Sequence, residues 1–402
     1  MDRPAVPTYI LRGHDAPIHA LRFYSRNAYL ASGDSEGWLI IWSLATKRPV
    51  AVWKGHEGAV MCIRHWTHKR LVSHGRDHTL RVWQVQDEDL ADLTTNLPGD
   101  KSSVDRREPW LLHSISVNAL NFCAFSMCNE LPGRTSRPET EAQLVASPNG
   151  LDSGGIDIFQ LPSERRVSQI ASAQDSPTGM VMAVSIFHDN AKSRLLVVSG
   201  YEDGRVMVHV RTGNFDKEGG WQKVTSSKLR PGSQPILSLE ISPSRDYFIT
   251  SGVDSWIAKY PLDLPDGMAG ESRETDRSSS IKTKHAGQQG LSIRSDGKIF
   301  ATAGWDARIR VYSTRTMKEL AVLQWHQQGC YATSFADLDL EANDLAAPTE
   351  YTGSDLSTQS NEILARPTAL DIIKSKREEK ARSIHWLAAG GKDGKISLWN
   401  IY

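Results

Sequence analysis

The sequence predicts an all-β fold made of one repeated unit, and three observations support this prediction. The segments LASGDSEGWLIIW (30–42) and LVSHGRDHTLRVW (71–83) share one pattern: an apolar strand, a polar turn, and an alternating strand that ends in tryptophan. Segments of this pattern recur along the chain, with a repeat of about 42 to 50 residues. Finally, the strand-like segment TYILR (8–12) precedes the first unit, while the last unit lacks an outer strand.

Seven units fit the pattern when they are taken in chain order. The third is the least regular: it extends from about Trp110 to Leu161 and closes on GGIDIF at 154–159. The last four are VVSGYEDGRVMVH (197–209), FITSGVDSWIAKY (248–260), FATAGWDARIRVY (300–312) and LAAGGKDGKISLW (387–399). Histidines that precede a unit occur at Gly13-His14, Gly55-His56 and His285.

This combination of features resembles the WD-repeat family, whose repeats each form a four-stranded blade. The resemblance implies an all-β fold, a seven-bladed WD-repeat β-propeller, as a single domain over residues 1–402. Only Asn400, Ile401 and Tyr402 follow the last unit, too few for an outer strand. We therefore expect residues 8–12 to supply the outer strand of the last blade and to leave no open edge beside the first.

Seven units of about 42 residues leave roughly a quarter of the chain for insertions. We place them at about 86–107, 124–141, 263–282 and 336–383. The last insertion begins with an acidic stretch and, up to residue 366, is too polar to order by itself. Its end, DIIKSKREEKARS (371–383), is typical of a short charged helix.

The composition excludes several functional classes. The 47 Lys and Arg residues balance 47 Asp and Glu residues, so we do not expect a nucleic-acid binder that relies on excess positive charge. No uninterrupted stretch of roughly 18 apolar residues occurs, and the N-terminal region lacks the apolar run of a signal peptide. We therefore expect neither membrane insertion nor secretion. The 4 cysteines are not spaced as a zinc clip, and we expect them to be reduced.

A histidine, a serine or threonine, an aspartate and an aromatic residue recur at matching positions, and the first three are the residue types of a nucleophilic triad. Because an enzyme needs one such set and this sequence repeats it, we interpret the sets as structural. Each carboxylate would accept hydrogen bonds from the histidine, the indole and the turn amides of its blade. We expect no catalytic residue, no cofactor site and no metal site. The expected structural network comprises His14, His56, Ser73, Asp77, Trp83, Asp203, Asp254, His285, Thr302, Asp306, Asp393 and Trp399.

The predicted function is protein binding through side chains on the turns at one face of the ring. The residue before each repeated aspartate should point out of its turn; in the first unit the matching pair is Ser35 and Glu36. Arginine and tryptophan are enriched at binding hot spots. The candidate partner-binding residues are Arg76, Glu202, Trp305 and Lys392.

Longer segments resemble one family more closely. They are LRGHDAPIHALRF (11–23), GYEDGRVMVH (200–209), ATAGWDARIRVY (301–312) with MKELAVLQWH (317–326), and GKDGKISLWNIY (391–402). They resemble the fungal ASTRA-associated protein 1 family, whose animal counterpart is the guanine nucleotide-binding protein beta-subunit-like protein 1. The resemblance implies a non-enzymatic scaffold of the nucleus, and also of the cytoplasm, within the ASTRA complex. This family is linked to chromatin remodelling and to the maturation of phosphatidylinositol-3-kinase-related kinases. The implied partners are other ASTRA subunits and kinase-maturation cochaperones, with no nucleic acid, membrane or small-molecule substrate.

Three other classes of propeller protein are alternatives. A G-protein beta subunit would need an N-terminal heptad helix, whereas this chain reaches its first expected strand by residue 8. A ubiquitin-ligase substrate receptor usually carries Trp-Asp-x-Arg after a strand, but the chain reads WSLA at 42–45 and WQVQ at 83–86. A histone-tail reader stays open, because Glu36, Glu202 and the acidic insertion are suited to binding lysines.

Overall fold

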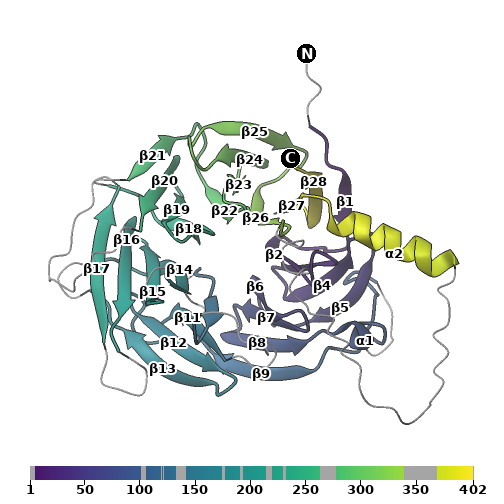
Figure 1. Cartoon of the computed structure of the whole chain (residues 1–402), viewed down its shortest axis with the longest axis horizontal. Coiled ribbons are helices and arrows are strands. Elements are labelled where there is room, and N and C mark those ends of the chain that lie inside the picture. Colours follow the sequence, from purple (N-terminus) through teal and green to yellow (C-terminus); the bar gives the residue numbers. More distant parts are fainter. Residues whose placement is uncertain are drawn as a thin grey trace, which may run out of the picture.

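Seven four-stranded antiparallel sheets stand around a central axis in the computed structural model (Figure 1). The structure describes residues 5–100, 106–118, 120, 122–132, 142–173, 177–190, 193–213, 220–229, 232–262, 278–338 and 369–401. The seven-bladed propeller predicted from the sequence is thereby confirmed.

Each blade runs from an inner strand at the axis to an outer strand at the rim. Blade one contains β2 (Ile18–Tyr24), β3 (Tyr29–Asp34), β4 (Trp38–Ser43) and β5 (Pro49–Lys54). Blade two contains β6 (Val60–Thr67), β7 (Arg70–Gly75), β8 (Thr79–Gln84) and β9 (Leu111–Ser116). Blade three contains β10 (Ser126–Asn129), β11 (Gln143–Pro148), β12 (Ile156–Leu161) and β13 (Arg165–Ile170). Blade four contains β14 (Val181–His188), β15 (Leu195–Tyr201), β16 (Arg205–Arg211) and β17 (Trp221–Lys228).

The remaining blades repeat this order. Blade five contains β18 (Ile236–Ile241), β19 (Tyr247–Gly252), β20 (Trp256–Pro261) and β21 (Ser279–Lys282). Blade six contains β22 (Gln288–Ile293), β23 (Ile299–Gly304), β24 (Arg308–Ser313) and β25 (Glu319–Gln324). Blade seven contains β26 (Cys330–Phe335), β27 (Trp386–Gly391) and β28 (Lys395–Asn400), and its fourth strand is β1 (Tyr9–Arg12).

The chain ends meet in blade seven, as the sequence predicted. Strand β1 pairs antiparallel with β28, and Tyr9 lies opposite Leu398. The amide of Thr8 extends the pairing by donating to the Leu398 carbonyl at 2.7 Å. The first segment of the chain thus covers the edge that β28 would otherwise expose.

The hydrophobic core lies between neighbouring blades, because alternating strand residues face the sheets on either side. The cluster between blades one and two joins Leu39 and Trp53 to Leu71 and Trp83. The rings of Trp53 and Trp83 meet edge to face, with centroids 5.8 Å apart. Each blade therefore depends on its neighbours for burial of its apolar residues.

Three strand assignments differ from the sequence-based expectation. Residues 111–116, which we expected in blade three, form β9 and pair with β8 as the outer strand of blade two. Strand β10 lies inside the predicted 124–141 insertion, and β21 inside the 263–282 insertion. Both are four-residue strands, SMCN and SSIK, without a run of large apolar residues. Their strand structure comes from pairing with β11 and β20, which local composition does not reveal.

The described parts of two insertions pack on the ring. In the 86–107 insertion, helix α1 (Asp87–Leu90) buries Leu90 against the core between blades one and two. In the 336–383 insertion, helix α2 (Ala369–Arg382) confirms the predicted charged helix and lies near β1 and β28 at the rim (Figure 1). Residues 339–368, which carry most of the predicted disordered stretch, lie outside the described residues. Among the described helices, none is long and apolar enough to cross a membrane.

Candidate functional site

The predicted polar network is present in blade two. His56 Nδ1 lies 3.0 Å from Asp77 Oδ1, and its Nε2 lies 2.7 Å from Ser73 Oγ. The indole of Trp83 donates to Ser73 Oγ at 2.8 Å rather than to the carboxylate. Burial alone would raise the pKa of Asp77, but the hydrogen bond and charge of His56 outweigh it and hold that pKa below its usual value.

Blade one has the same network with a different carboxylate. His14 Nδ1 lies 2.7 Å from Asp34 Oδ2, and Ser32 Oγ lies 2.7 Å from His14 Nε2 and 2.8 Å from Trp42 Nε1. The sequence analysis named His14 in this blade but missed Asp34, because repeat alignment places Glu36 at the acidic position. Glu36 is exposed, and its amide donates to Asp34 at 2.9 Å.

Blade seven completes its network with residues that the sequence analysis missed. His326 Nδ1 lies 3.1 Å from Asp393 Oδ1, and its Nε2 lies 2.9 Å from Ser397 Oγ, which also accepts from Trp399 Nε1 at 2.9 Å. A signal for His326 was present, because it follows the outer strand β25 by two residues just as His56 follows β5.

The other predicted members of the network are arranged differently. In blade six, His285 lies 3.3 Å from Asp306, whose main partner is the buried Arg310 at 2.6 Å. Thr302 donates to Gln288 at 2.8 Å instead of contacting His285. Asp203 accepts hydrogen bonds from the amide of Arg205 and from Lys228 Nζ, and Asp254 accepts one from the amide of Trp256. In blade three, Asn149 takes the central place and donates to Asp157 at 2.8 Å.

The buried position of the serines shows why these sets are structural. Ser32, Ser73 and Ser397 have at most 1% of their surface exposed. Each hydroxyl oxygen is engaged by a histidine ring and by an indole N–H. A nucleophilic serine must reach a substrate carbonyl, which these positions prevent. The three sets therefore hold the segment before each inner strand against the second and third strands of the blade and the turn between them.

The turns of six blades present one residue at an equivalent place. In each of these blades, the backbone amide of the residue before the repeated acidic position donates a hydrogen bond. The acceptor is the backbone carbonyl of the residue just before the inner strand of the same blade. The donors and acceptors are Ser35 and Pro17, Arg76 and Ala59, Glu202 and Met180, Val253 and Pro235, Trp305 and Gly287, and Lys392 and Gly329. The four candidate partner-binding residues therefore share one face of the ring, on which they are exposed.

A cavity of about 570 Å³ opens at the axis on this face. We call it the channel mouth. Its walls come mainly from the second residue of the inner strands, and its lining residues are Pro17, His19, Ala59, Met61, Arg76, Phe122, Met182, Leu237, Gln289, Trp305 and Tyr331. Most of these side chains are apolar or aromatic, and the volume is that of a typical ligand pocket.

Two of the four candidate residues, Arg76 and Trp305, line the channel mouth. The Arg76 guanidinium lies over the ring of Phe122, 4.6 Å from its centroid. Trp305 is 46% exposed, and its indole N–H donates to Gln289 Oε1 at 3.0 Å. The indole lies against Gly287, whose φ of +72° and lack of a side chain make room for it.

Glu202 and Lys392 do not line the channel mouth, although both are exposed on the same face. Glu202 Oε2 accepts the amide of Met180 at 3.1 Å, which holds this side chain over its own turn. The amide of Lys392 donates to Gly329 at 2.8 Å and positions its turn in the same way.

Aromatic residues of the mouth that the sequence analysis missed come from separate blades. Tyr331 stacks on His19 with ring centroids 5.0 Å apart, and Phe122 is 62% exposed. Blade three adds two exposed apolar side chains on its turns, Leu120 and Leu151. Counting to the second residue of each inner strand would have found His19 and Tyr331, whereas Phe122 precedes a strand that the sequence did not predict.

Comparison with known proteins places the chain in a family. The family model of ASTRA-associated protein 1 matches residues 7–399. The chain belongs to the ASTRA-associated protein 1 family. It is 46% identical to the protein of that name from Penicillium rubens, an alignment that covers 99% of this chain and 98% of the relative. The Aspergillus niger protein is also 46% identical, with the same shares covered. The Schizosaccharomyces pombe protein is 31% identical over 82% of this chain and 93% of the relative.

Membership of the ASTRA-associated protein 1 family agrees with the observed fold. The matched residues include all seven blades and the closing strand β1. Together with the propeller fold, the family supports a protein-interaction scaffold, because propeller rings present loops and turns for binding on a rigid frame.

Proposed function

We propose that this chain is a non-enzymatic subunit of the ASTRA complex that binds another protein through the channel mouth. Its role is to link this complex to chromatin remodelling and to the maturation of phosphatidylinositol-3-kinase-related kinases. Its partners are other ASTRA subunits and kinase-maturation cochaperones, and it acts in the nucleus and also in the cytoplasm. The family name supports the complex, and the channel mouth supports the site.

The exposed aromatic side chains around the mouth are the main observation behind this proposal. Trp305 and Phe122 keep 46% and 62% of their surface exposed beside a cavity large enough for an apolar side chain of a partner. Exposed apolar groups around a concave site mark interaction surfaces, and a central aromatic anchor with a polar rim is the usual form of a hot spot.

The charge of the mouth favours this function over recognition of a histone lysine. Arg76 is the charged side chain among the described lining residues, and none of those residues is an aspartate or a glutamate. A lysine inserted here would meet a guanidinium instead of a carboxylate. A partner with an apolar anchor and a neighbouring acidic residue fits the site better.

Affinity purification followed by mass spectrometry tests the proposal. The wild-type chain should recover ASTRA subunits, and the Trp305→Ala, Arg76→Ala double variant should recover them at least tenfold less, because a hot-spot loss weakens binding by about 2 kcal/mol or more. Leu320→Ala is the matched control, since Leu320 is 59% exposed on the outer strand β25. Normal recovery by a folded double variant would disprove the assignment of the site, and recovery of no ASTRA subunit by the wild type would disprove membership of the complex.

A further inference from the structure

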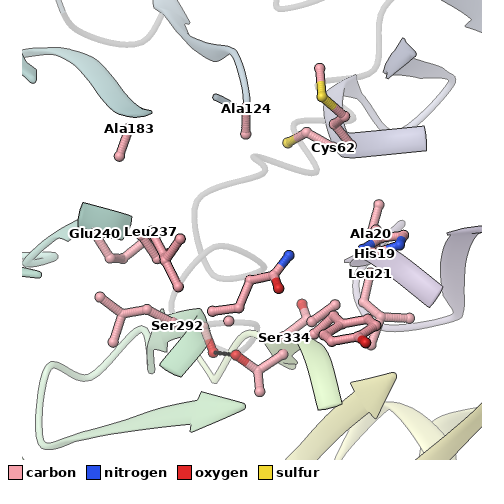
Figure 2. A pocket seen from close by; sticks show the side chains of 18 of the residues that line it. His19, Ala20, Leu21, Cys62, Ala124, Ala183, Leu237, Glu240, Ser292 and Ser334 are labelled. Atoms are coloured by element: carbon pink, nitrogen blue, oxygen red, sulfur yellow. Dashed lines mark hydrogen bonds between the residues drawn. The ribbon is translucent and has the colours of Figure 1, made fainter. Parts of the chain in front are cut away.

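Below the channel mouth the central channel continues into a smaller cavity of about 210 Å³. Figure 2 shows side chains that line this cavity, with Glu240, Ser292 and Ser334 among those labelled. Met61 and Leu237 line both cavities, so the two are continuous. The side chains that line this lower part differ from the apolar ones at the mouth. They include two arginines, a glutamate and two serines, which we call the polar ring: Arg22, Arg64, Glu240, Ser292 and Ser334.

The members of the polar ring occupy the same position in five inner strands. Each lies opposite an equivalent residue of the second strand in its blade, and these residues are Ala31, Val72, Ile249, Ala301 and Ala388. Equivalent positions in a propeller lie at one depth along the axis. The two arginines come from adjacent blades one and two, and Glu240 comes from blade five. The members of the polar ring therefore lie at one level of the channel.

The polar ring carries more positive than negative charge at neutral pH. Burial, followed by the charge of Arg64, lowers the pKa of Arg22 to about 10, which still leaves it protonated. The Nε of Arg22 donates to His65 Nδ1 at 3.2 Å. Burial together with both arginines lowers the pKa of His65 to about 3, so the imidazole of His65 is neutral. Two guanidiniums thus accompany one glutamate in the polar ring, and burial raises the pKa of Glu240 although both arginines oppose this effect. Asp337, which also acts on Arg22, is exposed and is screened by water.

Within the polar ring, Ser292 Oγ donates to Thr333 Oγ1 at 3.1 Å and Arg64 has a hydrogen bond with the Cys62 side chain, but the guanidinium of Arg64 keeps unused hydrogen-bonding capacity. Its Nε is buried and has no hydrogen-bond partner among the described residues. A buried donor of a charged group without an acceptor is costly, and guanidinium groups bind oxyanions with paired hydrogen bonds. We infer that the polar ring binds one small tetrahedral oxyanion, phosphate or sulfate, held by Arg22 and Arg64.

The size of the lower cavity restricts the group that can bind at the level of the polar ring. A volume of 210 Å³ corresponds to about seven water molecules at roughly 30 Å³ each. This accommodates a tetrahedral oxyanion with a few waters, whereas pockets for larger organic ligands usually measure about 300 to 1,000 Å³. Phosphate as a free ion and phosphate as the end group of a small metabolite share the same chemistry, and the experiment below distinguishes them.

Equilibrium dialysis with radiolabelled inorganic phosphate at constant ionic strength tests the inference on the full chain. The wild type should bind one phosphate, and Arg64→Met or Arg22→Met should weaken binding at least tenfold. Glu240→Gln should bind at least threefold more tightly, because it removes the opposing carboxylate. Arg315→Met is the matched control: it removes an exposed arginine outside the channel and should leave binding unchanged.

Equal phosphate binding by the wild type and a folded Arg64→Met chain, or no phosphate binding by the wild type, would overturn the inference. If the arginine variants do not fold, which circular dichroism would show, Glu240→Gln decides, since unchanged affinity there also overturns it. Competition by sulfate supports a simple oxyanion site. If glycerol 2-phosphate also displaces the bound phosphate, the ligand is the phosphate end group of a small metabolite. If glycerol 2-phosphate does not displace it, the ligand is the free ion. None of these measurements needs a protein partner, so their failure leaves the proposed function intact.

Discussion

Replacing Asp34 by alanine should destabilise the fold far more than replacing Glu36, although the repeat pattern gives the acidic position to Glu36. Asp34 is fully buried and accepts three hydrogen bonds: from His14 Nδ1 at 2.7 Å, and from the amides of Glu36 and Trp38 at 2.9 and 3.0 Å. Glu36 is exposed at the tip of the turn. The comparison therefore tests whether Asp34, and not the residue at the acidic position of the repeat, is the carboxylate of this network.

The size of the effect follows from these three contacts. A hydrogen bond to a charged acceptor contributes about 1.5 to 3 kcal/mol when it is buried. His14 is 6% exposed and cannot recover its lost bond from water, whereas the two partly buried turn amides can do so in part. We expect Asp34→Ala to lower the free energy of unfolding by about 3 kcal/mol. Glu36→Ala should change it by no more than about 0.5 kcal/mol.

Thermal unfolding and urea titration of both variants measure the difference. Unfolding entropy for a chain of this length is about 0.8 kcal/mol/K, so a loss of about 3 kcal/mol lowers the melting temperature by about 4 °C. Asp34→Asn, which keeps one acceptor oxygen, should lie between the wild type and Asp34→Ala. If Glu36→Ala destabilised the chain as much as Asp34→Ala, the carboxylate assignment for blade one would be refuted.

Two further predictions concern closure and acid stability. Deletion of residues 1–12 removes β1 and exposes the edge of β28, so the truncated chain should melt less cooperatively or aggregate; an unchanged melting curve would contradict the role of β1. The pKa values of Asp77 and Asp393 are lowered in the fold, because their histidine partners outweigh the effect of burial. Their stabilisation is therefore complete above the unfolded pKa, near pH 4, and is lost as the pH falls below it. Urea titrations at pH 7 and pH 3 should show a smaller acid-induced loss for Asp77→Asn than for the wild type, and an equal loss would contradict the assignment.

The sequence predicted the ring because its blades carry strong local signals. Units such as LVSHGRDHTLRVW alternate apolar and polar residues, and this alternation buries one set of side chains between blades. Blade three lacks these signals. Its inner strand β10 has four residues, and Asn149 replaces a histidine network with amide hydrogen bonds to Asp157 and to the turn. Pairing between strands, which a single sequence does not display, defines this blade.

The candidate site was predictable in part for a geometric reason. Arg76 and Trp305 were found because their place before a repeated aspartate fixes them on one face. The repeat pattern alone does not tell which of the turns bend toward the axis. The side chain of Trp305 lines the channel mouth because Gly287, in the turn before the inner strand of its blade, leaves space for the indole. Glu202 is held by the amide of Met180 in its own blade, a contact that depends on three-dimensional structure.

The three complete His–Asp–Ser–Trp networks occur in blades seven, one and two, which are neighbours in the ring and contain the point of closure. Closing the ring brings Tyr9 beside Leu398, and the entropy of such a long loop costs on the order of 5 kcal/mol. Gly394 in the turn of blade seven lies against the backbone of His14, so the networks of blades seven and one are in contact across this junction. Rigid turns on both sides of β1 and β28 reduce the freedom that closure must still remove. Blade three, on the far side of blade two from the junction, has no such network among its described contacts and instead exposes Leu120 and Leu151. We therefore expect blades seven, one and two to hold the structure closed, while blade three adds apolar surface for a partner bound at the channel mouth.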